Sequence, residues 1–433
     1  MSTFTADACA ALPGPSWLGA RRAEAFERYS SSPLPTEAEE VWRYSRIGAL
    51  DLDAYAPAGG TAPGAGVPDE LAALLEAVGE RSALVVVRNG RVAAASVDPA
   101  VAARGVYVGP LADTEAGADL LGSVARPVDA FVSLSTAFLA DALVVQVPRG
   151  VVVPHPVVVL QWIDGGTSPA VGTAPAVFPR LIVSAGESAQ VTVLDHTGSP
   201  PGTPALVAPV VELDVGDNAH VGYLAVQELA REAWQLGYHA SRVGADGTLT
   251  SSIVALGGGY ARVRTESELS GRGATSNLLA AYFGDGDQMH DFRTLQDHVA
   301  PRTTSKLLFK GAVEDESHAV YSGLIRVRKG AAGTDAEQTN RNLVLDAGAR
   351  ADSVPNLEIE ENDVRCTHAS AVGPVDEDQR YYLEARGVPP EVAERLIVLG
   401  FFDDVIAHRH APVPSLRPLL RAAVAAKLGR ESG

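Results

Sequence analysis

Cysteine is scarce in this sequence, and long apolar runs are absent. Cys9 and Cys366 are the two cysteines among 433 residues, too few and too far apart for a disulfide framework, so a reducing cytosol is the expected location. The most apolar segment, Val151 to Leu160, contains two prolines, and no segment reaches the roughly 20 residues that a membrane-spanning helix needs. The N-terminus MSTFTADACAALPGPSW lacks the basic and apolar regions of a secretory signal. We therefore expect a cytoplasmic, unexported protein.

Positive charge is also in short supply. The chain carries 35 Lys and Arg against 53 Asp and Glu, a formal net charge of -18. Such a chain repels phosphate backbones and anionic lipid headgroups, so neither nucleic acid nor a membrane surface is an expected partner. We attribute the rarity of lysine, together with the abundant Ala and Gly, to coding bias; lysine occurs only at Lys306, Lys310, Lys329 and Lys427.

Several motifs of catalytic chemistry are missing. The sequence contains no GxxxxGK[ST] phosphate loop, no GxSxG nucleophile elbow and no HExxH zinc motif. We therefore expect a chain that is not an enzyme and binds no ATP itself. His290 and His298 lie eight residues apart, which matches no standard metal signature. The acidic run at 314–316 is typical of a solvated turn.

Short β-branched segments dominate the chain between about residues 140 and 365, separated by Gly, Pro and Asp. A Gly-x-x-small motif recurs at 186–189, 216–219, 244–247, 271–274 and 348–351, and its first four glycines are 30, 28 and 27 residues apart. Glycine suits corners that need a positive φ angle, and a quasi-periodic series of strands indicates a solenoid. A β-sandwich or barrel with glycine at ordinary turns is the alternative.

The two ends of the chain have a different pattern. Residues 1–80 predict helices and a Pro/Gly-rich linker, residues 81–375 a strand-rich region with a β-helix core, and residues 376–433 helices again. In the last region apolar residues recur at three-to-four spacing, interrupted at Gly387 and Pro389. This pattern predicts two helices joined by a tight turn, followed by a final helix from Ser415. A helical tail on a β-rich body is a candidate docking element.

Longer segments resemble the SufB/SufD family of the SUF iron–sulfur cluster assembly system. They are EVWRYS near the N-terminus, LSTAFLADALVVQVPRGVVVPHPVVV, HDFRTLQDHVAPRTTSKLLFKGAVEDESHAVYSGLIRV with the following QTNRNLVL, and the stretch from Leu343 to Phe402. The resemblance covers nearly the whole chain. It implies a mainly β fold, with a right-handed parallel β-helix core and N-terminal and C-terminal helical regions. It also implies a scaffold subunit for iron–sulfur cluster assembly.

Within this family the sequence is more similar to the SufD branch. The SufB branch has a cysteine where Ala347 stands here and a glutamate near His368, whereas this chain has Cys366-Thr367-His368, the Cys-x-His arrangement of SufD. The family more often continues His-Gly-Ala-Thr, and here the residues are His-Ala-Ser-Ala. A SufB-like primary scaffold is the alternative. A β-helix polysaccharide-degrading enzyme is a more distant one, disfavoured by the scattered acids and the absent secretion signal.

Cys366 and His368 are the candidate metal-binding residues. Alternate residues of a strand face the same side, so the two side chains should project together, and both thiolate and imidazole bind iron. Iron–sulfur sites typically use four ligands, so this pair is incomplete alone. The resemblance implies a nascent cluster at an interface with a SufB-like paralogue. The alternative interpretation is a small buried cysteine beside a hydrogen-bonded surface histidine.

The resemblance also implies further partners. In the family the C-terminal helices dock SufC, an ABC-type ATPase, and the complex has been associated with a flavin. The chain in isolation could form a homodimer. The alternative for the C-terminal helices is that they only pack against the β-rich body. The interface residues that the resemblance implies are Tyr382, Leu383, Arg386, Gly387, Leu396 and Phe401.

Overall fold

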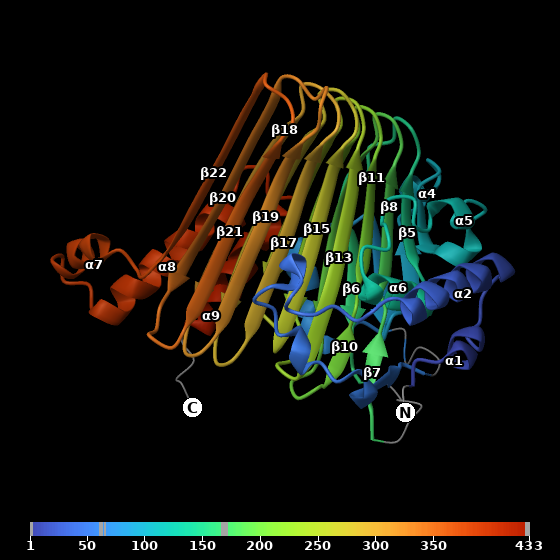
Figure 1. The fold of residues 1–433 in the computed structure, drawn as a ribbon, viewed down its shortest axis with the longest axis horizontal. Helices are drawn as coiled ribbons and strands as arrows, with labels where there is room; N and C mark the ends of the chain where they lie inside the picture. Colours follow the sequence, from blue (N-terminus) through green and yellow to red (C-terminus); the bar gives the residue numbers. More distant parts are fainter. Residues whose placement is uncertain (1–2, 60–63, 65, 166–171, 429–433) are drawn as a thin grey trace.

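The computed structural model describes residues 3–59, 64, 66–165 and 172–428. Two long β-sheets face each other, and helices lie at both ends of the chain (Figure 1). From β11 onward the chain passes alternately from one sheet to the other, so each full turn adds one strand to each sheet. The prediction of a mainly β protein with a parallel β-helix core between helical ends is therefore confirmed.

Strands in each sheet pair almost entirely in parallel. The first sheet has the order β21-β19-β17-β15-β13-β11-β8-β5-β4, and the second has the order β22-β20-β18-β16-β14-β12-β9-β6-β2-β3. Only the N-terminal edges differ, because β4 and β3 run antiparallel to their neighbours. The bounds in the first sheet are β4 Tyr107–Pro110, β5 Leu143–Val147, β8 Arg180–Ala185, β11 Val210–Val215, β13 Ala233–Val243, β15 Tyr260–Leu269, β17 Met289–His298, β19 His318–Val327 and β21 Arg350–Ile359, with β1 Tyr55–Pro57, β7 Ala174–Val177 and β10 Ala205–Val207 joining it off this path. The bounds in the second sheet are β2 Ala83–Arg88, β3 Arg91–Val97, β6 Val157–Trp162, β9 Gln190–Gly198, β12 His220–Glu228, β14 Thr248–Ala255, β16 Thr275–Gly284, β18 Thr304–Val313, β20 Thr334–Val344 and β22 Val364–Gly373.

The core lies between the two sheets and is built from every second residue of each strand. Phe292 of β17, Phe309 of β18 and Tyr321 of β19 are fully buried there. Their rings meet edge to face, with centroids 5.6 Å apart for Phe292 and Phe309 and 5.5 Å apart for Phe309 and Tyr321. Burial of apolar surface contributes roughly 25 cal/mol per Å². The β-branched and aromatic runs therefore stabilise the β-helix by packing across its interior.

Turns from the first sheet to the second contain the first four Gly-x-x-small motifs, but the first glycine is not the residue with the positive φ angle. One turn of the β-helix accounts for the spacing of about 30 residues between motifs. The fifth motif, at 348–351, lies at the opposite edge, between β20 and β21. The prediction that this glycine supplies the positive φ angle is wrong, because that angle occurs at the third position, in Ser188, Asn218, Asp246 and Gly273.

The first glycine of each motif is needed because successive turns stack closely. A Cβ atom at Gly216 would lie 2.8 Å from the carbonyl oxygen of Ala185, and one at Gly271 would lie 2.0 Å from the backbone nitrogen of Ala245. Real Cβ atoms do not approach backbone atoms this closely. Glycine at this position thus reflects a backbone contact between neighbouring turns and not an unusual φ angle.

Replacing Gly271 by Ala is expected to destabilise the protein by about 1–3 kcal/mol or more, because the added methyl group overpacks a contact between two backbones. Gly400 provides the matched control, since it is exposed in a helix and a Cβ there meets no atom within 4 Å. Gly400→Ala should stabilise the protein by up to about 1 kcal/mol through helix propensity. Urea unfolding measures both changes, and a Gly271→Ala protein that unfolds at the wild-type urea concentration would contradict the stacking argument.

Helices near the N-terminus cover part of the outer face of the first sheet (Figure 1). Helices α2 and α6 pack on each other, and Arg22 of α2 is 1% exposed and donates through Nε to the carbonyl oxygen of Leu139 at 2.8 Å. Three short helices lie between β3 and β5, within the region expected to be rich in strands. Residues 60–63 and 65 of the expected linker lie outside the described part of the chain. The helix bounds are α1 Ala6–Ala10, α2 Ser16–Ser31, α3 Ala72–Val78, α4 Pro99–Ala102, α5 Gly117–Leu120 and α6 Ala130–Ala137.

Helices α7 Glu377–Glu384, α8 Pro390–Ile406 and α9 Arg417–Lys427 follow the last strand. Gly387, with φ +86°, forms the tight turn between the first two, as the sequence predicts. Val398 and Phe402 of α8 and Val424 of α9 pack against apolar side chains on the outer face of the second sheet. Helix α7 has no buried residue and projects from the body (Figure 1). No helix in the described ranges has the length and apolar composition needed to cross a bilayer.

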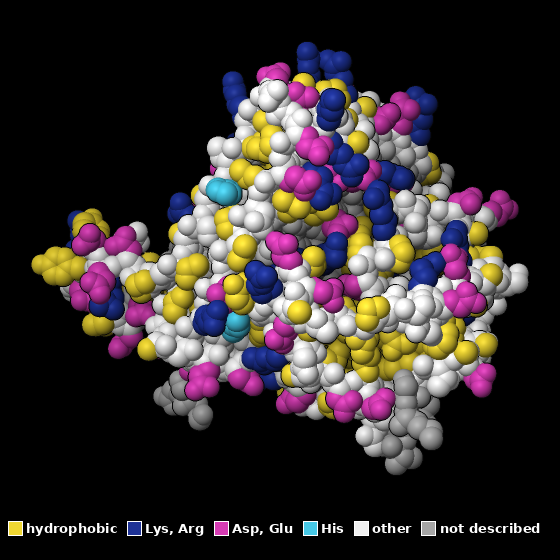
Figure 2. Space-filling model, in the orientation of Figure 1, with side chains coloured by type: hydrophobic (Ala, Val, Ile, Leu, Met, Phe, Trp, Pro, Cys, Tyr) yellow, Lys and Arg dark blue, Asp and Glu magenta, His cyan; other side chains and the backbone are white. Residues whose placement is uncertain are grey.

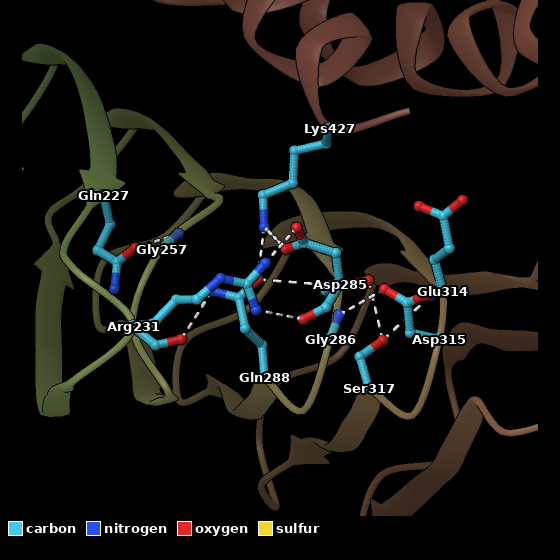
Figure 3. Close-up of polar contacts among 12 residues, drawn as sticks. Gln227, Arg231, Gly257, Asp285, Gly286, Gln288, Glu314, Asp315, Ser317 and Lys427 are labelled. Carbon is cyan, nitrogen blue, oxygen red and sulfur yellow. Dashed lines mark hydrogen bonds and ion pairs between the residues drawn. The ribbon is translucent and has the colours of Figure 1, made fainter. Parts of the chain in front are cut away.

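A buried polar cluster attaches the end of α9 to the β-helix (Figure 3). The amino group of Lys427, a residue 5% exposed, donates to Asp285 and Gln288 in the turn between β16 and β17. Asp285 also pairs with Arg231. In the next turn, burial raises the pKa of Glu314 to about 7, with neighbouring carboxylates adding to the effect. The last helix is therefore held by a buried charge pair as well as by apolar packing.

Candidate functional site

The C-terminal end of the β-helix is open in the described structure. Strands β21 and β22 form the last turn, and each pairs with one strand of the preceding turn. Inward-facing apolar residues become exposed there: Leu357 is 37% exposed and Ile359 is 43% exposed, whereas Ile325 and Val327, their partners on β19, are fully buried. The last turn therefore presents core-type side chains to the solvent, which is typical of a surface that another element covers.

Cys366 and His368 lie on β22 in this open turn. Their register partners on β20 are Ala336 and Gln338. Both partners are 1% exposed and face the interior. Since strand neighbours in register share a face, Cys366 and His368 both point toward the interior side of the open end. Cys366 is half-buried and packs beside the last apolar cluster, whereas His368 is exposed.

The thiol of Cys366 is not activated in the isolated chain. Burial raises its pKa above the usual value, and the carboxylate of Asp335 on the neighbouring strand raises that pKa further. The thiol is therefore protonated at neutral pH and is a weak nucleophile. A soft metal ion that binds it must displace this proton. The chemistry of the pair fits iron, with one sulfur donor and one imidazole donor, but it provides fewer than the four ligands of a complete cluster.

A buried polar network lies further along the same strands, below Ser370 and Val372, and sequence reasoning missed it. The side chain of Asn340 accepts hydrogen bonds from Ser353 at 2.7 Å and from Asn342 at 2.8 Å. Ser353 in turn accepts a 2.7 Å bond from Ser370, which is exposed on the open turn. The signal that could have revealed it is the alternation Gln-x-Asn-x-Asn in QTNRN, because amides at every second position of a buried strand must face the interior.

The outer face of the first sheet carries a groove of about 530 Å³. Its arginines are already paired, since Arg264 contacts Glu266 and Arg326 donates to Glu358 at 2.9 Å. Figure 2 shows this mixture of basic and acidic side chains across the middle of the molecule. The groove therefore offers little unbalanced charge to an anionic ligand.

His290 and His298 lie on β17, face the interior of the β-helix and are fully buried. Both ring nitrogens of His298 lie within hydrogen-bond distance of hydroxyls, Thr303 at 2.7 Å and Ser305 at 2.9 Å. Burial lowers the pKa of His298 to about 4 and that of His290 to about 3. Neutral imidazoles in the core are consistent with a packing role. Within the described residues, no group of three or more His, Cys, Asp or Glu side chains could hold a metal ion.

The residues expected at the ATPase interface divide into two groups. Tyr382 is 56% exposed, with Arg386 stacked 4.3 Å over its ring, and Leu396 is 46% exposed. Gly387 is exposed in the tight turn, and Leu383 is half-buried. Phe401 instead packs against the body, because its ring lies 4.3 Å from the amino group of Lys310 and meets the ring of Phe402.

Tyr381 is the most exposed large apolar residue of the described chain, at 72%, and sequence reasoning did not single it out. It stands beside Tyr382 on α7. In Figure 2 hydrophobic side chains gather on the projecting part of the molecule that Figure 1 identifies as α7. A helix without buried residues that exposes two tyrosines is typical of a protein-binding surface.

The comparisons with known proteins agree with this architecture. Residues 168–401 match the model described as "SUF system FeS cluster assembly, SufBD core domain", and residues 12–159 match the SufBD protein N-terminal region. An iron–sulfur cluster assembly SufBD family protein of Mycobacterium bovis is 37% identical over 313 residues, covering 70% of this chain and 75% of that protein. The iron–sulfur cluster assembly protein SufD of Escherichia coli is 28% identical over 85% of this chain and 84% of the Escherichia coli protein. The SufD protein of Bacillus subtilis is 26% identical over 96% of this chain and 94% of the Bacillus subtilis protein. The chain therefore belongs to the SufBD family of the SUF system for iron–sulfur cluster assembly.

Proposed function

We propose that this chain is a SufD-type scaffold subunit that acts without catalytic turnover of its own. It pairs with a SufB-like paralogue through the open end of the β-helix and docks a SufC-like ABC ATPase through its C-terminal helices. The nascent iron–sulfur cluster is cargo, to which Cys366 and His368 contribute two ligands. The observation that carries this proposal is the position of both donors on the inward face of a last turn that no other described element covers.

Three features support pairing at the open end. The last turn exposes apolar side chains that the preceding turns bury, and Val372 on β22 is 44% exposed. The outer edges of β21 and β22 offer backbone groups that can extend both sheets into a partner. The metal site lacks ligands that the same partner could supply. In isolation the same surface would favour a homodimer.

Two observations favour the SufD branch over the SufB branch. The turn position at which the SufB branch has a cysteine is occupied here by Ala347, which offers no ligand. The relatives from Escherichia coli and Bacillus subtilis that cover most of this chain are named SufD. A SufB-like primary scaffold would need a third donor from this chain close to the Cys366–His368 pair.

Co-purification with co-expressed partners tests both surfaces at once. Changing Tyr381 and Tyr382 to Ala should lower recovery of the ATPase at least about tenfold, since buried interface tyrosines each contribute roughly 1–2 kcal/mol or more. Val372→Asp should lower recovery of the paralogue, because it places a charge in the apolar open end. The recovered proteins are quantified on gels against the tagged chain.

Each variant serves as the control for the other, because the two surfaces lie on different elements. The tyrosine variant should keep the paralogue, and Val372→Asp should keep the ATPase. Thermal unfolding of the isolated chain should change little in both cases, since all three residues are exposed. A wild-type chain that recovers neither partner would overturn the proposed scaffold role.

A further inference from the structure

Gln338 lies on β20 beside the buried polar network of the open end but takes no part in its hydrogen bonds. It is 1% exposed, yet neither its amide nitrogen nor its amide oxygen has a hydrogen-bond partner among the described residues. Its neighbours on β20 differ, because Asn340 bonds to Ser353 and Asn342 bonds to Asn340 and Tyr282. A buried amide without partners costs about 1–3 kcal/mol per polar group. Such a residue calls for an explanation in terms of what it meets in the working protein.

The position of Gln338 suggests what it meets. His368 is its register partner on β22, so the two side chains stack on the same inward face of neighbouring strands, about 4.8 Å apart along the sheet. The amide nitrogen of Gln338 extends toward β19, where a Cβ on Gly323 would lie only 2.6 Å from it. Pro355 of the last turn stacks on Gly323. The amide group thus lies in the interior, directly below the turn that carries the imidazole.

We propose that Gln338 is a positioning residue for His368, an inference that rests on the proposed function of this site. Its amide oxygen accepts the imidazole N–H that does not face the metal, which fixes the ring orientation and leaves the other nitrogen free to bind. Metal-ligating histidines almost always donate their second ring nitrogen to such an acceptor. Gln338 lies in register with His368, and neither polar atom of its amide has a partner among the described residues. It is therefore placed to provide this acceptor.

Gln296 of β17 provides a matched control for a purely structural role. It is also a glutamine, fully buried, inward-facing and without a hydrogen-bond partner for either amide atom among the described residues. Its register partner in the next turn is Ile325, and not a histidine. Removing either amide should therefore change packing to a similar extent, whereas only the Gln338 amide lies next to His368.

Cobalt binding to the full-length chain tests the proposal. Co²⁺ accepts the same nitrogen and sulfur donors as iron, and a bound thiolate gives a charge-transfer absorption. The site signal is the part of the anaerobic Co²⁺ titration that His368→Ala removes. Gln338→Leu and Gln338→Met should weaken this component about 10–100-fold, the usual effect of losing a supporting hydrogen bond to a metal ligand. Gln338→Glu, which keeps an acceptor oxygen, should bind within a few-fold of the wild type, and Gln296→Leu should bind unchanged.

Each other outcome rejects a defined part of the argument. If Gln338→Leu and Gln338→Met bind cobalt like the wild type while His368→Ala loses it, His368 is a ligand and Gln338 does not position it. If Gln296→Leu weakens binding equally, or Gln338→Glu fails to restore it, the effect is general packing and the proposal is wrong. If His368→Ala changes nothing, the proposed metal site itself fails. Thermal unfolding of each variant excludes loss of the fold as the cause.

Discussion

Replacing His368 by Ala is expected to lower the iron and sulfide content of the co-purified complex by about tenfold or more, while thermal unfolding of the isolated chain stays unchanged. The imidazole is exposed on the last turn, so its removal creates no cavity in the core. It is also one of two donors that we propose this chain contributes, and loss of even a supporting contact to a metal ligand costs 10–100-fold in affinity. Anaerobic co-expression, followed by absorbance and iron and sulfide counting, measures the change.

Thr367 provides the control for this experiment. It lies between the two proposed ligands, is exposed, and faces the opposite side of β22. Thr367→Ala should leave the cluster content unchanged, which separates an effect of the imidazole from any disturbance of the strand. A His368→Ala complex that carries as much iron and sulfide as the wild type would remove the basis of the proposed site.

Replacing Asp291 by Ala is expected to destabilise the protein by about 3–5 kcal/mol, the usual cost of leaving buried charges without their partner. Asp291 of β17 is fully buried and accepts hydrogen bonds from Arg262 at 2.5 Å, Arg293 at 2.6 Å and Tyr260 at 2.9 Å. Both arginines also donate to backbone carbonyls of the segment 41–43, and Arg262 lies 3.8 Å over the ring of Trp42. The carboxylate therefore holds the two cations that bind the N-terminal segment to the β-helix.

The pH dependence of this contribution has a defined sign. Burial alone would raise the pKa of Asp291, but Arg262 and Arg293 outweigh burial and hold the pKa below its usual value. A carboxyl group with a lowered pKa in the folded state contributes stability above its unfolded pKa, about 4, and loses it as the pH falls further. Wild-type stability should therefore decline below about pH 4, and Asp291→Ala should lack this part of the decline.

Urea unfolding near neutral pH measures the loss, and an exposed ion pair provides the comparison. Arg126, whose side chain is 69% exposed, donates to Glu268 at 2.8 Å on the protein surface. Arg126→Ala should cost less than about 1 kcal/mol, because solvent screens such pairs. Equal effects of Arg126→Ala and Asp291→Ala would show that the buried charges contribute no more than a surface pair. Protease digestion of Asp291→Ala should also cut the segment at 41–43 sooner than in the wild type.

Much of the fold follows from local patterns, and the parts that do not are those that depend on contacts between turns. The alternation of short strands with turns at intervals of about 30 residues indicates a solenoid, because the interval is a property of the chain itself. The role of Gly271 could not be read in this way, because its neighbour Ala245 belongs to the preceding turn. Two of the three helices between β3 and β5, α4 and α5, have only four residues each and no clear period, so local patterns do not predict them.

The candidate site, too, is predicted only in part by local sequence patterns. The spacing of Cys366 and His368 predicts that they share a face, but which face of the sheet that is depends on the register with β20. The raised pKa of Cys366 comes from its burial and from Asp335 across the strand pair. Phe401 is among the expected interface residues, and helical spacing alone does not say that the amino group of Lys310 lies against its ring. Local sequence patterns identify candidate residues, but the contacts of those residues depend on strands and helices that are distant in the sequence.

The burial of two of the four lysines determines which lysine side chains an amine-reactive reagent can reach. Lys310 is 3% exposed and Lys427 is 5% exposed, so both are protected. Lys306 on β18, with 44% of its side chain exposed, and Lys329 in the turn before β20 lie within the last turns of the β-helix. A lysine-directed cross-linker therefore captures this subunit through residues beside the open end. The protein it joins there would identify the neighbour on that surface, without a label having to be engineered into the chain.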